Sequence, residues 1–365
     1  MELNFKIPFY ARAALIFISV FAFVYTMYIG QDIIIPIVYA TIFAILLNPL
    51  VNFLLHKKMS KIIAISLVVS ITLILTLIIF YLFFSQLSMF SKSFPQFKVK
   101  LDLANDNLVN WASNQFGYRP SKINKWITDT QSQAISSYAN GETLSQLGQL
   151  TITLVLIPVY LFMMLYYKSL LLEFIRKLFR FEHHTAVVEV LANSKNIIQS
   201  YLVGLFFEMI IMAVLNSAAL LILGIDYAII LGILAAVLNI IPYIGGIVAT
   251  LLPMIIAFVT KDSLVYPALV FAVTIFIQFV DNNFIVPKIV ASRVQINALI
   301  SIIGVLIGGA IWGVAGMFLS IPLIAILKVI FDHIESLKPW GFLFGNIVPT
   351  TSKFSFIKPK NKSLQ

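Results

Sequence analysis

Residues 227–259 read YAIILGILAAVLNIIPYIGGIVATLLPMIIAFV and carry no charged side chain. A straight helix of this length would reach about 50 Å, whereas the hydrocarbon core of a bilayer is about 30 Å thick. Two complete crossings and a turn would need about 40 residues, so the run is too short for them. We predict an interruption at Ile241-Pro242-Tyr243-Ile244-Gly245-Gly246, because proline lacks a backbone donor and glycine tolerates unusual backbone angles.

A second run, residues 298–327, presents the same mismatch of length. It contains five glycines around Trp312, at Gly304, Gly308, Gly309, Gly313 and Gly316. We predict that both runs are broken helices or re-entrant hairpins, with half-helices that reach about 22 Å into the bilayer. The alternative is one long, tilted and kinked helix, whose glycines only allow neighbouring helices to approach closely.

The remaining apolar stretches fit one crossing each. They are residues 13–29, 33–55, 62–84, 150–167 and 201–225, with a shorter sixth at 264–280. The whole chain is 60% apolar and 11% charged, with a mean hydropathy of +0.98. We therefore predict an all-α polytopic transmembrane protein with about eight membrane segments, which has the lipid bilayer as its main partner.

The basic residues indicate the orientation in the membrane. The net charge is +10, but the Lys and Arg side chains sit in loops beside apolar runs, as the positive-inside rule expects, and do not point to nucleic acid. The loops that we expect in the cytoplasm contain Lys57, Lys58 and Lys61, and then Lys168, Arg176, Lys177, Arg180 and Lys195. Both termini are then cytoplasmic.

This pattern divides the chain into six parts. We expect three spans over residues 1–84, an extracytoplasmic helical cap over 85–149, a fourth span over 150–167, a cytoplasmic amphipathic linker over 168–200, a transport half with broken helices over 201–335, and a basic cytoplasmic tail over 336–365.

Ionisable groups inside hydrocarbon cost enough free energy that each one needs a reason. Glu208 lies inside the fifth span, and Asn216 follows eight residues later on about the same helical face. One interpretation is a coupling-ion or proton site that faces a cavity. The other is an acid near a helix end that water still reaches at the cytoplasmic interface.

A second polar group closes the sixth span. Gln278, Asp281, Asn282 and Asn283 precede Pro287, and we expect the helix to end there. Carboxylate and carboxamide oxygens on unwound backbone are typical of transporter sites for small cations or polar solutes. A polar helix end at the membrane surface is the alternative.

The third candidate is the break in the first long run. Asn239, Pro242, Tyr243, Gly245 and Gly246 would present freed backbone groups to a substrate, although a turn without a ligand explains them nearly as well.

Signals for catalysis are weak. The chain has no cysteine and no Gly-rich phosphate loop, and His183-His184 lacks metal-ligand spacing, so we predict neither an enzyme nor a metal or other cofactor.

Three of these motifs together resemble the AI-2E (autoinducer-2 exporter) transporter family, formerly UPF0118. They are Asn239 to Gly246, Gln278 to Pro287, and the Gly309-Ala310-Ile311-Trp312-Gly313-Val314-Ala315-Gly316 stretch that leads to Pro322. The resemblance covers nearly the whole chain. It implies an eight-segment bacterial inner-membrane permease that forms a homo-oligomer such as a pentamer, with members linked to autoinducer-2 export or to Na⁺/H⁺ or Li⁺/H⁺ antiport.

We accordingly predict a secondary transporter for a small solute or a monovalent cation or proton. A structural or regulatory membrane protein and an uncoupled channel are the alternatives.

Overall fold

The computed structural model describes residues 8–82, 155–242, 244–291 and 294–346, with a few positions between 84 and 103. In this part of the chain six helices are long and apolar enough to cross a membrane, or seven if a bent pair counts as one span. The prediction of a polytopic α-helical membrane protein is confirmed. The expected cap over residues 85–149 lies almost wholly outside the described residues, as does most of the basic tail.

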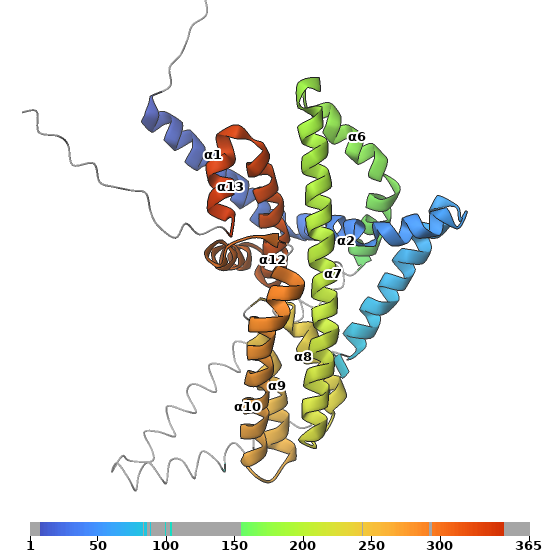
Figure 1. The fold of residues 1–365 in the computed structure, drawn as a ribbon, viewed down its shortest axis with the longest axis vertical. Helices are drawn as coiled ribbons and strands as arrows, with labels where there is room; N and C mark the ends of the chain where they lie inside the picture. Colours follow the sequence, from blue (N-terminus) through green and yellow to red (C-terminus); the bar gives the residue numbers. More distant parts are fainter. Residues whose placement is uncertain are drawn as a thin grey trace, which may run out of the picture.

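The described helices run in the following order along the chain (Figure 1). They are α1 Phe9–Ile29, α2 Gln31–His56, Lys61–Leu82, Val155–Tyr166, α6 Lys168–Leu178, α7 His184–Ile222, α8 Ala228–Asn239, α9 Ile244–Thr260, α10 Val265–Val280, two π-helical segments Asp281–Ile285 and Pro287–Ala291, α12 Ala298–His333 and α13 Lys338–Phe344.

The early spans pack into one apolar cluster. It joins α2 with Lys61–Leu82 and Val155–Tyr166 through buried side chains at Ala40, Ala44, Val51, Ala64, Ile65, Val68, Leu161 and Leu165. Alanines occupy three of these eight positions, and small side chains let helix backbones approach closely in lipid, where van der Waals packing drives helix association. We call these eight residues the scaffold cluster.

Helix α7 is longer than any span that the sequence predicted. It has 39 residues, so the last residues of the predicted amphipathic linker and the fifth span form one continuous helix. At about 1.5 Å per residue this helix is about 58 Å long. Figure 1 shows α8, α9 and α10 along one half of it and α6 near its other end.

The first long run is broken where the sequence placed the break. Helix α8 ends at Asn239 and α9 begins at Ile244, and the two pack side by side. Ala228 and Leu231, near the start of α8, share an apolar cluster with Ile256 and Ala257, near the end of α9. The run therefore folds back on itself as a hairpin and is not one long helix.

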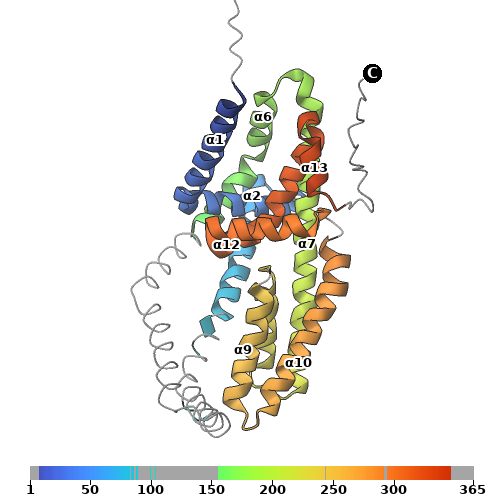
Figure 2. The ribbon, with the colours of Figure 1, turned by 90° about the vertical axis from the view of Figure 1, so that its left-hand side faces the viewer.

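The second long run also folds back. Trp312 leaves the helical region, and Gly313 has φ of 60°, a conformation that favours glycine. The hydroxyl of Ser320 donates to the carbonyl oxygens of Gly304 at 2.9 Å and of Gly316 at 2.6 Å. A Cβ on Gly308 would come within 2.5 Å of the Gly316 carbonyl oxygen, so glycine is required where the two arms touch. Figure 2 shows α12 lying across α7, with α9 and α10 on one side of it and α13 on the other.

One prediction about the sixth span is wrong. We expected the helix to end at the polar group around Gln278 to Asn283, before Pro287. Instead, α10 continues through Asp281–Ile285 and Pro287–Ala291 with π-helical hydrogen bonding, and the apolar helix extends from Val265 to Val290. The wider i to i+5 turn tolerates a proline that would interrupt a regular α-helix, so the chain does not have to unwind.

The α12 hairpin can be tested by cross-linking, because the chain has no cysteine of its own. We expect Gly304→Cys with Ile324→Cys to form a disulfide under mild oxidation, since a Cβ on Gly304 would meet the Ile324 side chain, whose Cγ1 atom lies 3.2 Å from it. In one straight helix the two positions would be about 30 Å apart. Leu306→Cys with Ile324→Cys is the matched control, because Leu306 is 64% exposed. A disulfide in the control alone, or in neither variant, would contradict the hairpin.

Candidate functional site

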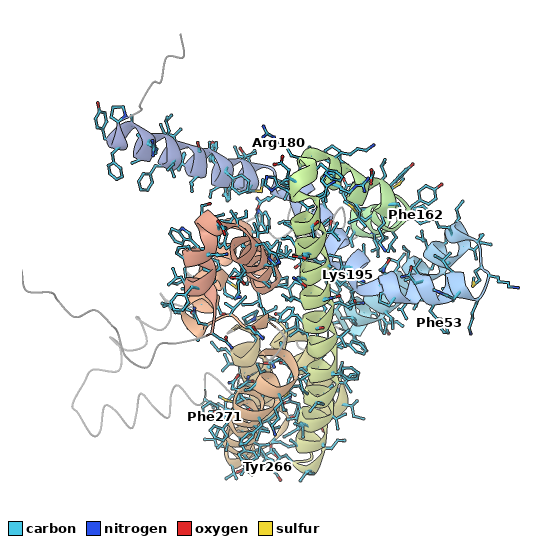
Figure 3. The ribbon with its side chains drawn as sticks, turned by 45° about the horizontal axis from the view of Figure 1, so that its top comes forward. Phe53, Phe162, Arg180, Lys195, Tyr266 and Phe271 are labelled. Carbon is cyan, nitrogen blue, oxygen red and sulfur yellow. The ribbon has the colours of Figure 1, made fainter. Side chains whose placement is uncertain are left out.

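A cavity of about 890 Å³ lies where the two broken runs meet α7 and α10. Both hairpins contribute to its wall: Asn239, Ile240, Pro242 and Gly246 come from the break between α8 and α9, and Ser301, Val305 and Ile321 come from α12. The other lining residues are Tyr201, Leu205, Glu208, Ile247, Thr250, Leu251, Phe271, Ile275, Gln278, Phe279, Asp281, Asn282, Val286, Val290, Val294 and Ile296. Figure 3 labels one of them, Phe271 of α10.

Two carboxyl groups meet at the centre of this cavity wall. Glu208 of α7 is 6% exposed, and Asp281 of the π-helical segment is 1% exposed. The side-chain amide of Asn239 donates to Asp281 Oδ2 at 2.9 Å and lies 3.4 Å from Glu208 Oε1. One carboxamide from the broken helix therefore bridges two acids from different elements.

The Asp281 carboxyl group is only partly satisfied. Gln278 Nε2 lies 3.5 Å from Oδ2, a long and weak contact, while the buried Oδ1 has no hydrogen-bond partner. A buried oxygen without a partner costs about 1–3 kcal/mol, and an ionised one costs more. The lone pairs of Oδ1 can therefore still accept a proton or a hydrogen bond.

Two glycines allow close packing on either side of the polar groups. A Cβ on Gly204 of α7 would lie 2.7 Å from the carbonyl oxygen of Ile289, so this glycine lets α7 contact the second π-helical segment directly. A Cβ on Gly246 of α9 would lie 3.1 Å from the side-chain carboxamide of Gln278. Asp281 lies between these two contacts on the helix that runs from Val265 to Val290, which is thus held close to α7 and α9.

The structure separates the predicted site residues into two groups. It brings Glu208, Asn239, Pro242, Gly246, Gln278, Asp281 and Asn282 to one cavity. Asn216 does not line the cavity, and its side-chain amide donates to the Met212 carbonyl oxygen. Asn283 lies on the surface, where its side-chain amide donates to the Phe279 carbonyl oxygen. Pro287 is exposed at the start of the second π-helical segment, Gly245 packs on Leu238, and Tyr243 lies outside the described residues.

Three polar lining residues were not predicted from the sequence. They are Tyr201 on α7, Thr250 on α9 and Ser301 on α12. Tyr201 had a usable signal, because Tyr201, Leu205 and Glu208 are spaced by four and three residues and so share one face of the helix. The sequence gives no signal that singles out Thr250 or Ser301, since single hydroxyl groups are common in membrane helices.

The ionisable groups define the charge preference of the cavity. The described lining residues include three ionisable groups, which are the carboxyl groups of Glu208 and Asp281 and the phenol of Tyr201. None of these lining groups is cationic. Two carboxylates buried together are strongly unfavourable unless a proton or a cation compensates them. No set of three or more metal-ligating His, Cys, Asp or Glu side chains occurs in the part of the chain that the structure describes. The site therefore suits protons, monovalent cations and small neutral or cationic molecules, and it disfavours anions.

Comparison with known proteins adds a family context. Residues 16–336 match the family model described as AI-2E family transporter. YueF of Bacillus subtilis, named as a transport protein, is 25% identical over 239 residues, which are 65% of this chain and 64% of YueF. YrrI of the same organism, also named as a transport protein, is 31% identical over 134 residues, 36% of this chain and 37% of YrrI. PerM of Escherichia coli, named as a permease, is 27% identical over 188 residues, 51% of this chain and 53% of PerM. The matches thus cover about a third to two thirds of these relatives.

The Asn239 bridge gives a prediction about stability. Asn239→Leu removes the amide that donates to both acids, so we expect the free energy of unfolding to fall by about 1–3 kcal/mol. Thermal unfolding of the purified protein in detergent measures this change. Asn283→Leu is the matched control, and we expect it to change stability by less than about 0.5 kcal/mol because this carboxamide is exposed. Equal losses in the two variants would contradict the bridge.

Proposed function

The chain belongs to the AI-2E transporter family, and from this membership and the geometry of the cavity we propose that it is a secondary transporter. In this proposal a small solute occupies the cavity, and the Glu208–Asn239–Asp281 group binds the coupling proton or monovalent cation. The solute is a small neutral molecule of the autoinducer-2 kind, or the cargo is Na⁺ exchanged for H⁺. We place the protein in the bacterial inner membrane, with both termini in the cytoplasm, as a homo-oligomer.

One observation carries the proposal: two buried carboxyl groups from different helices share a single neutral donor inside a cavity that broken helices line. A structural protein has no need for this arrangement, because two apolar side chains would pack the same space without the desolvation cost. A transporter does need a site whose net charge changes when an ion arrives. The pair provides such a site.

The cavity also suits a small solute. Its volume of about 890 Å³ lies within the range of small-molecule sites, roughly 300–1,000 Å³. Its wall is mainly apolar, with the carboxyl groups, carboxamides and hydroxyls placed at a few positions, which is the usual composition of such sites. The ends of α8 and α9 lie at the wall, as in transporters that bind cargo at interrupted helices.

Coupling follows from charge compensation. Without a bound cation or proton, the pair keeps a negative charge in a low-dielectric environment, which favours a conformation that leaves water at the cavity. Binding of the ion removes this charge and lets the cavity close around solute. The free energy of ion binding is thereby linked to the conformation that holds cargo.

We expect Glu208→Gln and Asp281→Asn each to lower gradient-driven flux in sealed proteoliposomes by about ten- to a hundredfold, the equivalent of one lost charge-assisted interaction of roughly 1.5–3 kcal/mol. Flux is measured with an imposed proton or Na⁺ gradient against no gradient. Glu335→Gln is the matched control for the loss of one acid, because the Glu335 side chain is 94% exposed.

The outcomes separate the functions. A coupled transporter is supported if flux through the wild type requires a gradient, and if each site variant either transports more slowly or no longer requires the gradient. Uncoupled flux would identify a channel, and no flux for any solute tested would favour a structural role. Unchanged coupled flux in both variants would remove the carboxyl pair from the mechanism.

A further inference from the structure

Three lysines from different elements gather at one end of the scaffold cluster, away from the cavity. Lys61 begins the helix Lys61–Leu82, Lys168 begins α6, and Lys195 lies on α7, where Figure 3 labels it. The ammonium group of Lys61 donates to the carbonyl oxygen of Tyr166 at 2.7 Å and lies 4.8 Å from the centroid of the Tyr166 ring. The ammonium group of Lys168 donates to Asn48 Oδ1 at 2.9 Å.

These cations are held together by neutral acceptors. The ion pairs among the described residues involve other cations, and no described carboxylate lies within ion-pair distance of Lys61, Lys168 or Lys195. Burial lowers the pKa of Lys168, and the nearby charges of Lys195 and Lys61 lower it further. Three like charges therefore stand close together with hydrogen-bonding capacity to spare, since each ammonium has three donors.

The surroundings match the depth of lipid headgroups. Lys61 is the first residue of the apolar helix Lys61–Leu82, and Lys168 comes two residues after the end of the apolar helix Val155–Tyr166. Helix α6, which starts at Lys168 after a bend of 69°, exposes Leu170, Phe174 and Leu178. A helix with exposed apolar residues and several basic ones lies in the interface plane, with its apolar side chains among the acyl chains.

We propose that Lys61, Lys168 and Lys195 form a binding site for the phosphate of an anionic phospholipid headgroup. The three ammonium groups surround the phosphate, and the acyl chains lie beside the apolar side chains of α6. Basic pockets between transmembrane helices on the cytoplasmic side bind such headgroups in this way. The site is independent of the transport proposal, because none of its residues lines the cavity.

The test is a lipid titration of the purified full chain in zwitterionic detergent, followed by thermal unfolding. Phosphatidylglycerol is the anionic probe, phosphatidylcholine the zwitterionic one, and inorganic phosphate the soluble one. We expect phosphatidylglycerol alone to raise the unfolding temperature, because a ligand that binds only the folded form stabilises it. Replacement of the three lysines by Gln should weaken this effect by about fivefold per lysine, the equivalent of roughly 1 kcal/mol each.

Two further variants keep the test decisive. Replacing Lys57, Lys58 and Lys177 by Gln removes the same charge outside the site and should leave the lipid effect unchanged. Replacing Lys61, Lys168 and Lys195 by Arg keeps the charge and should preserve binding even if the Gln variant folds poorly. An equal response to inorganic phosphate would overturn the lipid assignment, and equal losses in the two Gln variants would overturn the site itself.

Discussion

Hydrocarbon offers no hydrogen bonds, so every backbone amide and carbonyl group at membrane depth must find its partner within the protein or face water. An interrupted helix is therefore tolerated only where local bonds, neighbouring helices or a wet cavity receive the freed groups. At the break after α8, the amides of Ile240 and Ile241 bond three residues back, to Val237 and Leu238, and Gly245 bonds to Ile241. The bend of α12 lies near the end of α1, where the Trp312 indole donates to the Met27 carbonyl oxygen. This constraint explains why the first break lies at the cavity and the second at another helix.

The polar cavity follows from the same constraint. Half-helices such as α8 cannot cross the bilayer alone, so their ends stop at membrane depth beside α7. A carboxamide at such an end, Asn239, is then within reach of acids on unbroken helices. The acids are unfavourable there, because their desolvation exceeds what one neutral donor returns. The proposed binding of a proton, a cation or a polar solute would account for this unfavourable arrangement.

Arithmetic on length predicted the broken segments, because neither 33 nor 30 apolar residues fit one or two crossings. The cost of ionisable groups in hydrocarbon indicated Glu208, the polar end of the sixth span indicated Gln278 and Asp281, and the break in the first long run indicated Asn239. Other features had no signal in the sequence. The π-helical continuation past Asp281 depends on backbone hydrogen bonds, which leave no mark on the pattern of apolar residues. Asn216 shares α7 with Glu208 but lies about 12 Å further along it, and its amide donates to the Met212 carbonyl oxygen. Where the cavity ends along α7 depends on contacts between helices, which a single sequence does not encode locally.

Two glycines set how the neighbours of Asp281 pack. Asp281 lies between Gln278 and Ile289 on the helix that runs from Val265 to Val290. Helix α7 contacts this helix through Gly204, backbone against backbone at Ile289, whereas α9 contacts it through Gly246, against the side chain of Gln278. In the proposed mechanism, a displacement of Asp281 on ion binding would be passed directly to α7, because no flexible side chain lies between the two backbones to absorb it. Helix α9 would follow through the Gln278 carboxamide, and because α9 lines the cavity, the occupancy of the acid pair and the shape of the solute space would change together.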